Sequence, residues 1–206
     1  AFGDDAMSGF EEDDPNADPL ARKLELAEEF RQIGDTEGAR DLLQEVIAKA
    51  SGSLKTKAQG IMCLNNTKQL ILATHMYAGD NEDKMPPHRV NATSGSIWYP
   101  YEVGRQTGPN VWTDGPHNLG SLWKARDIPD GKIFYCPSAN KYPGGFRYDT
   151  YAQNAAWPFG QPTTDPYYNA GIVRSGYSYF PQSKDKEVVG GREIAKVGQT
   201  KIGSVN

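Results

Sequence analysis

Hydrophobic residues recur at helical spacing along residues 54–87, LKTKAQGIMCLNNTKQLILATHMYAGDNEDKMPP, and this stretch predicts one long helix. Counted at about 100° per residue, half of the circumference carries Leu54, Ala58, Ile61, Met62, Leu72, Ala73, Met76 and Tyr77. The other side carries Thr67, Lys68, Thr74 and His75, together with Leu64 and Ile71. Such a wide apolar face is typical of a helix that is buried on more than one side. Gly79 is placed to end the helix, and Pro86-Pro87 prevents a restart.

Two shorter helices are predicted ahead of the long one, over residues 18–33 and 37–49. Asp18 is a suitable N-cap followed by Pro19, Gly34 ends the first helix, and Asp35 or Thr36 caps the second. The short turn between them forces an antiparallel hairpin. We expect Ser51-Gly52-Ser53 to break the chain before the long helix. Residues 1–17 hold six acidic residues and no basic one, which predicts a flexible tail.

The chain after residue 88 is rich in turn formers and aromatics, with short β-prone runs. Ile97-Trp98-Tyr99 and Ile133-Phe134-Tyr135 are such runs, and residues 175–180 alternate as in a half-buried strand. Residues 119–124 predict a helical turn, and Ile194, Val197 and Ile202 are candidate strand contacts. The expected fold class is therefore α+β, with the long helix packed on a small antiparallel sheet that has long loops.

Composition narrows the classes of protein to which the chain can belong. Its mean hydropathy is −0.66, and no apolar run approaches the roughly 18 residues that span a bilayer. No signal peptide is visible, so we expect a soluble protein that is cytosolic or has lost its targeting segment. Residues 1–54 hold 5 Lys/Arg and 14 Asp/Glu, whereas residues 55–206 hold 17 and 12, which indicates two parts of different origin or role. No Lys/Arg cluster favours nucleic-acid binding.

The sequence contains two cysteines, Cys63 on the long helix and Cys136 in IFYCPS. A disulfide between them would fasten the helix to the later segment if the compartment oxidises thiols. Two buried free thiols are the other interpretation. Spacing alone leaves both open.

Residues 18–50 resemble a tetratricopeptide-like repeat, and in particular the C-terminal domain of the FimV family of bacterial inner-membrane proteins. The resemblance rests on LARKLELAEEFRQIGDTEGARDLLQEVIAKA, with Gly34-Asp35 at the turn and Ala39-Arg40-Asp41 opening the second helix. It implies a domain of residues 18–53 that mediates protein–protein contacts. The alternative is a generic helical hairpin, and either needs the start of the long helix to complete its core.

From Cys63 onward the chain resembles a type II secretion pseudopilin of the G-type, pilin-like family. CLNNTKQLILATHMYAGDNEDKMPP, KIFYCPSA and RSGYSYFPQS carry the resemblance in the same order, and together they cover most of residues 54–206. It implies a structural subunit, whose partners are other pilin-like subunits and the secretion machinery. The periplasmic, inner-membrane-anchored location of that family also favours the Cys63–Cys136 disulfide.

The two resemblances point to opposite sides of a membrane, because the FimV domain is cytoplasmic and the pseudopilin domain is external. The apolar segment and the N-terminal Phe and Glu of pseudopilins are missing, and the acidic hairpin stands in their place. We therefore expect an engineered chimera with its junction within residues 51–63. A natural gene of unusual architecture is the alternative.

Motifs for catalysis and cofactors are not found, so no enzymatic activity and no cofactor are expected. His75, His88 and His117 show no metal-ligand spacing, and His75 is expected at the surface. The chain lacks GxSxG, GxxxxGK[ST] and GxGxxG. Asp80, Glu82 and Asp83 could hold calcium, but they also fit a solvated helix end, and no metal is predicted.

Two further groups invite a structural explanation. Asn65, Asn66 and Gln69 fall inside the apolar half of the long helix, and buried amides must be hydrogen-bonded. We expect Asn65 or Gln69 to hold the backbone of a later loop. The tryptophans Trp98, Trp112, Trp123 and Trp157 either form an exposed platform for carbohydrate or partner proteins, or fill a core that is poor in Leu and Val.

Overall fold

The computed structural model describes residues 18–89, 99–108, 111–141, 146–152, 157–158, 171–180 and 186–195. The chain divides into two compact units, Ala1–Ala58 and Gln59–Asn206. The third helix, α3 (Gly52–Asp80), begins in the first unit and continues in the second. Of the described residues, no helix is both long and apolar enough to cross a membrane.

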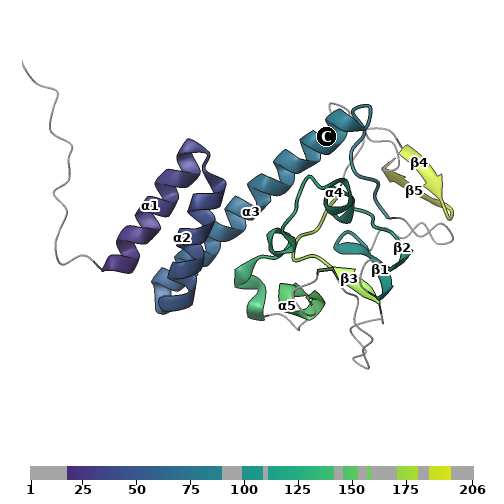
Figure 1. Cartoon of the computed structure of the whole chain (residues 1–206). Helices are drawn as coiled ribbons and strands as arrows, with labels where there is room; N and C mark the ends of the chain where they lie inside the picture. The colour runs from purple at the N-terminus through teal and green to yellow at the C-terminus, as the bar shows by residue number, and fades with distance from the viewer. Residues whose placement is uncertain are drawn as a thin grey trace, which may run out of the picture. The chain divides into compact units, whose positions relative to one another are not determined.

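The first unit contains the predicted hairpin, formed by α1 (Pro19–Ile33) and α2 (Thr36–Lys49), which lie side by side in Figure 1. The Asp18 carboxylate accepts a hydrogen bond from Leu20 N at 2.9 Å, and the Asp35 carboxylate accepts one from Gly38 N at 2.8 Å. Both helices therefore begin at the predicted caps. Gly34 has φ 91°, the left-handed conformation that ends a helix at low cost in glycine. The buried apolar residues of these helices are Leu24, Ala27, Ala39, Leu43 and Val46.

Helix α3 confirms the predicted long helix but differs from the prediction in two respects. Gly52 and Ser53 belong to its first turn, so the expected break at 51–53 is confined to the residues before Gly52. The helix also runs one residue beyond Gly79. Its buried side recurs every three or four residues and consists of Ala58, Ile61, Met62, Asn65, Asn66, Leu70, Ala73, Thr74 and Ala78.

The predicted apolar face of α3 is therefore rotated from the buried side. The prediction places Leu72 and Met76 on this face, yet they are 61% and 51% exposed, whereas Leu70 is 5% exposed. Thr74, placed on the polar side, is buried because its hydroxyl is satisfied within the helix by donating to Leu70 O at 2.8 Å. Hydrophobicity alone could not centre the face, because polar residues with internal partners share the buried side.

The second unit contains a small antiparallel sheet of order β2-β1-β3, formed by β1 (Glu102–Gly108), β2 (Val111–Asp114) and β3 (Ile172–Arg174). The register pairs Arg105 with Asp114 in β2 and with Ile172 in β3. A separate hairpin joins β4 (Lys186–Val189) to β5 (Arg192–Ala195) through Gly190 and Gly191, both at positive φ. Helices and a small antiparallel sheet confirm the α+β fold class (Figure 1).

Short helices fill the connections, and two predicted strands are wrong. Helix α4 (Gly120–Ala125) confirms the helical turn near residues 119–124. Ile133-Phe134-Tyr135 is not a strand, because η1 (Gly131–Phe134) is a 3-10 helix capped by the Asp130 carboxylate, which accepts from Lys132 N at 2.8 Å. Residues 175–180 are also irregular, and the strand lies just before them at β3. The remaining short helices are η2 (Pro137–Lys141) and α5 (Tyr148–Tyr151).

The core of the second unit combines aliphatic side chains with a group of aromatic rings. Phe134 is fully buried and stacks on Trp157, with ring centroids 5.0 Å apart and planes inclined by 16°. A side chain on Gly131 would overlap with the Trp157 ring, so the 3-10 helix must approach through a glycine. Around this pair lie Leu70, Ala73, Val103, Leu119, Leu122, Ile128, Ile133, Tyr135, Tyr151, Val173 and Tyr179.

Candidate interaction face of the long helix

The two cysteines are brought together at the start of the second unit. A disulfide joins Cys63 of α3 to Cys136, which lies between η1 and η2, and their Cα atoms are 5.0 Å apart. The Ser138 hydroxyl lies 2.8 Å from Cys136 Sγ and 3.3 Å from Cys63 Sγ. The bridge covalently fastens α3 to a segment 73 residues later in the chain.

Hydrogen bonds from α3 reinforce the same attachment. Asn66 is 2% exposed, and its Nδ2 donates to Tyr135 O at 2.9 Å. Gln59 Nε2 donates to Pro137 O at 3.4 Å, and Tyr177 Oη donates to Cys63 O at 3.2 Å. The amide of Asn66 thus holds the backbone of a later loop, which is the role expected of Asn65 or Gln69.

The two amides expected in this role differ in burial. Asn65 is fully buried, whereas Gln69 is only half-buried. Choosing among three neighbouring amides requires the exact rotation of the helix, which the sequence pattern does not fix.

Tyr135 connects this attachment to the aromatic core. Its Oη donates to Arg174 O at 2.7 Å and accepts from Trp157 Nε1 at 3.0 Å. Complete burial raises the pKa of the Tyr135 phenol well above its usual value, which outweighs the opposite effect of the Trp157 hydrogen bond. The phenol is therefore a neutral structural group and offers no acid or base for chemistry near neutral pH.

Large apolar side chains project from α3 on the side away from the buried Leu70, Ala73 and Thr74. Leu64, Ile71, Leu72 and Met76 are 63%, 56%, 61% and 51% exposed. They recur at spacings of seven, one and four residues, so they occupy one side of the helix over more than three turns. We call these four residues the α3 face. Scattered single hydrophobic residues need no explanation, but a row of four on one helix side marks a candidate contact surface.

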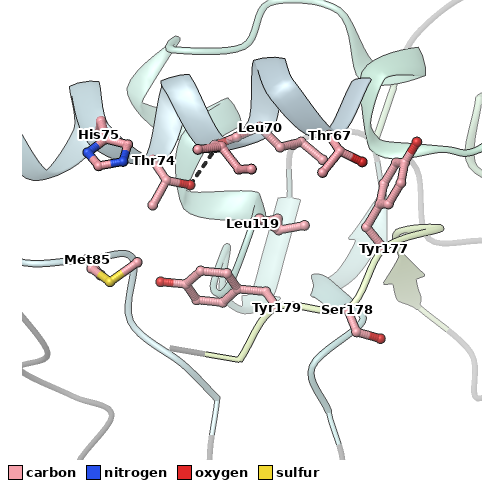
Figure 2. A pocket seen from close by; sticks show the side chains of 10 residues that line it. Thr67, Leu70, Thr74, His75, Met85, Leu119, Tyr177, Ser178 and Tyr179 are labelled. Carbon is pink, nitrogen blue, oxygen red and sulfur yellow. Dashed lines mark hydrogen bonds between the residues drawn. The ribbon is translucent and has the colours of Figure 1, made fainter. Parts of the chain in front are cut away.

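A groove of about 340 Å³ lies beside the α3 face (Figure 2). Its α3 wall consists of Thr67, Leu70, Ile71, Thr74 and His75, and the rest of its lining is Met85, Leu119, Tyr177, Ser178 and Tyr179. Ile71 therefore belongs both to the α3 face and to the edge of the groove. His75, which is exposed as predicted, lies at the Met85 end in Figure 2, and Tyr177 lies at the other.

The hydroxyl groups of the groove are mostly engaged within the protein. Thr67 Oγ1 donates to Cys63 O at 2.9 Å, and Tyr179 Oη donates to Pro86 O at 2.9 Å. The hydroxyls of Thr74 and Tyr177 donate to the backbone as described above. Burial raises the pKa of Tyr179 far above its usual value, so this phenol stays neutral. The groove therefore offers a mainly apolar surface despite its Thr and Tyr content.

A buried ionic cluster lies elsewhere in this unit. Glu102 is 1% exposed, and its Oε2 lies 2.9 Å from Arg89 Nη1 and 3.6 Å from His117 Nε2. Its Oε1 lies 3.7 Å from Arg105 Nη2, while Arg89 Nη2 lies 2.7 Å from Asp114 Oδ2. The cluster attaches the segment that follows α3 to β1 and β2. Sequence reasoning missed it because no motif in this stretch shows that Arg89, Glu102 and Asp114 meet.

The remaining candidate residues are placed as follows. In the described part of the chain, no three His, Cys, Asp or Glu residues are grouped to hold a metal ion. Glu82 pairs with Lys84, with Nζ and Oε2 2.6 Å apart, and Asp80 and Asp83 are exposed at the end of α3. His88 is buried, with its ring 5.6 Å from that of Phe180.

The described tryptophans pack mainly on one another. Trp157 is 8% exposed, and its ring lies 5.7 Å from that of Trp123, which lies 6.3 Å from that of Trp112. Trp123 and Trp112 are half-buried. Trp98 lies outside the described residues. This arrangement favours the core interpretation of these aromatics over an exposed platform.

Comparison with known proteins finds similarity only over a short stretch. Motility hub protein FimV from Pseudomonas aeruginosa strain PAO1 is 39% identical over 61 residues, and so is FimV from strain UCBPP-PA14. The match covers 28% of this chain but 7% of each FimV, so the chain spans a small fraction of these relatives. No family model matches the chain. No solved structure matches it either.

Proposed function

We propose that residues 54–206 are the soluble part of a pilin-like subunit of a type II secretion or type IV pilus-like pseudopilus. In this proposal the chain acts by assembly, and no residue is catalytic. The observation that carries the proposal is the α3 face, whose four large apolar side chains are about half exposed or more. Its partners are other pilin-like subunits and the secretion machinery.

The size of the α3 face fits a weak, repeated contact. Full burial of a Leu-sized side chain contributes about 1.5–3 kcal/mol, so burying the exposed remainder contributes about 1 kcal/mol for each residue. Four such residues contribute about 4 kcal/mol, which does not exceed the roughly 4–15 kcal/mol that association costs. Isolated pairs should therefore be weak. An array in which each subunit meets several neighbours gains from effective concentration and can be stable.

The disulfide supports a periplasmic location for the native form of this part. Disulfides persist in oxidising compartments and are rare where thiols are kept reduced. The Cys63–Cys136 bridge joins α3 to the loops of the same unit, which suits a domain that works outside the cytoplasm.

We further propose that residues 18–53 are a FimV-like hairpin for protein contact, joined to the pilin-like part within residues 51–63 in an engineered chimera. The 39% identity to motility hub protein FimV supports the FimV-like assignment and a motility- or pilus-related context. The opposite compartments of the two resemblances support the fusion. A sequence survey that finds residues 1–50 and 64–206 in one natural reading frame would contradict the fusion alone.

Carbohydrate binding through the aromatics is a weaker candidate function. The described tryptophans pack against one another, and Trp157 is buried. A glycan array that shows saturable binding, lost on Trp112→Ala or Trp123→Ala, would favour this function over assembly.

Assembly is tested by displaying the full chain on nickel-lipid vesicles through an N-terminal histidine tag, which replaces membrane anchoring and raises the local concentration. We expect amine cross-linking to give ladders of oligomers on vesicles and little product in solution. Leu72→Glu and Met76→Glu should each abolish the ladder, because they place charge in an apolar contact. Val188→Glu is the matched control, since Val188 is 72% exposed but lies on β4. A ladder that persists in both α3 variants would refute the proposal.

A further inference from the structure

We propose that the groove beside α3 binds a medium-chain fatty acid, with its saturated chain along the helix and its carboxylate at His75. This inference rests on the groove, which shares only Ile71 with the α3 face, and binding of a small probe tests it separately from assembly. The dimensions of the groove, the chemistry of its wall and the imidazole at one end carry it (Figure 2).

The dimensions fit a single acyl chain. The α3 wall runs from Thr67 to His75, which corresponds to about 12 Å at a rise of about 1.5 Å per residue. Each carbon advances an extended chain by about 1.25 Å when C–C bonds are about 1.5 Å long, so the wall matches about ten carbons. A volume of about 340 Å³ lies in the range of small-molecule sites.

The chemistry of the wall selects an acyl chain over a peptide. The hydroxyls of Thr67, Thr74, Tyr177 and Tyr179 all donate to backbone carbonyls of the protein. A peptide laid in the groove would bury N–H and C=O groups with few partners, and unpaired buried amides are costly. A saturated chain has no such groups, and it gains from contact with Leu70, Leu119 and Met85.

A hydrogen-bond donor at one end of the groove places the head group. His75 is the one imidazole among the lining residues, and it is exposed at the Met85 end of the groove. No acidic residue lines the groove, and the next acidic residue along α3, Asp80, lies more than a turn beyond His75. Imidazole N–H groups donate hydrogen bonds to carboxylates, so His75 favours a carboxylate head at this end of the groove.

The test measures binding of decanoate to the full chain by isothermal titration calorimetry, below the concentration at which decanoate forms micelles. We expect saturable binding with one site, weakened about two- to four-fold for each methylene removed from the probe. Ile71→Glu should lower the affinity about ten-fold or more, because it places a carboxylate at the edge of the apolar groove. Leu64→Glu adds the same charge to the same helix outside the groove and should leave the affinity unchanged.

The head group is tested separately with decanol, which has the same chain without the carboxylate. Wild type should prefer decanoate, and His75→Gln should reduce this preference several-fold while decanol binding stays unchanged. Absence of decanoate binding to the wild type, or equal binding to wild type and Ile71→Glu, would overturn the inference. Concentration-dependent association that Ile71→Glu abolishes while no probe binds would assign the groove to a second copy instead. None of these results depends on the cross-linking of Leu72 and Met76 variants.

Discussion

Removal of the Cys63–Cys136 disulfide should destabilise the second unit by an amount that follows from its loop length. The bridge closes a loop across a sequence separation of 73 residues. Loop-closure entropy for that length is about 15 cal/mol/K, which corresponds to about 4 kcal/mol at about 25 °C. Stability of a single domain is about 5–15 kcal/mol, so the Cys63→Ser, Cys136→Ser double variant should retain the fold with a much smaller margin.

The assay is urea unfolding followed by tryptophan fluorescence. All four tryptophans lie between residues 98 and 157, so the signal reports the second unit and not the α1–α2 hairpin. With an m-value of about 2 kcal/mol/M, a loss of about 4 kcal/mol lowers the urea midpoint by about 2 M. Wild type in reducing agent should match the double variant, and the variant itself should not respond to reducing agent.

Two results would refute this reasoning. Thiol titration of the unfolded, unreduced chain should find no free thiol, and two thiols would show that the bridge does not form. A midpoint shift of under about 0.5 M, with the bridge shown to be present, would mean that the long loop does not dominate the entropy of the unfolded chain.

Three further predictions concern single polar groups. Asn66→Ala should lower the unfolding free energy of the second unit by about 1–3 kcal/mol, because it leaves a buried backbone carbonyl without its donor. Glu102→Gln should cost about 3–5 kcal/mol in the same urea assay, since the Arg89 guanidinium loses its buried counter-charge. The two lysines at Glu45, first Lys23 and then Lys49, lower the pKa of its carboxyl from 4.5 to about 2. Its contribution to hairpin stability is therefore present above about pH 4.5 and lost as pH falls toward about 2. Glu45→Gln should accordingly lower the thermal midpoint of helix circular dichroism at neutral pH, and this effect should shrink steadily as the pH falls from about 4.5 toward about 2.

Matched variants separate these effects from nonspecific damage. Asp114→Asn removes a carboxylate that also pairs with Arg89 but is 44% exposed, so it should cost under about 1 kcal/mol. If Glu102→Gln and Asp114→Asn lowered the unfolding free energy equally, burial of Glu102 would not explain why its ion pair contributes more. Asn81→Ala removes a half-buried amide that donates to Tyr77 O within its own turn, and it should cost less than Asn66→Ala.

Local signals predicted the helical part of the fold well. Asp18, Gly34 and Asp35 determine where α1 begins and ends and where α2 begins, through contacts within a few residues, which a sequence displays directly. Strands were predicted poorly, because β1 carries EVGRQTG, a run of low β-propensity, and forms by pairing with β3 about 70 residues later. Ile133 and Phe134 show the reverse case, a run of high β-propensity that is not a strand. The Asp130 cap and the close packing at Gly131 favour a 3-10 helix there instead.

The disulfide is the one feature of the candidate site that the sequence could suggest. Two cysteines in one chain permit one intramolecular bridge, so Cys63 and Cys136 could be named together, although spacing alone could not decide between a bridge and free thiols. The groove could not be predicted, because its lining is drawn from α3, the segment after it, α4's start and residues 177–179. Such a set exists only after the chain has folded.

The mismatch between the hydrophobic pattern of α3 and its burial is the strongest reason to look for a partner. The helix buries the amides of Asn65 and Asn66 while it leaves Leu64, Leu72 and Met76 more than half exposed. A helix that served only the core of its own unit would gain by the reverse arrangement, since each buried amide must find a hydrogen bond and each exposed Leu forgoes about 1 kcal/mol or more. Local rules are most often broken where a protein has a function to perform. The wide apolar circumference seen in the sequence therefore combines two surfaces, one that joins the core of the unit through Leu70 and Ala73 and one that stays exposed, which is the surface that the assembly proposal requires.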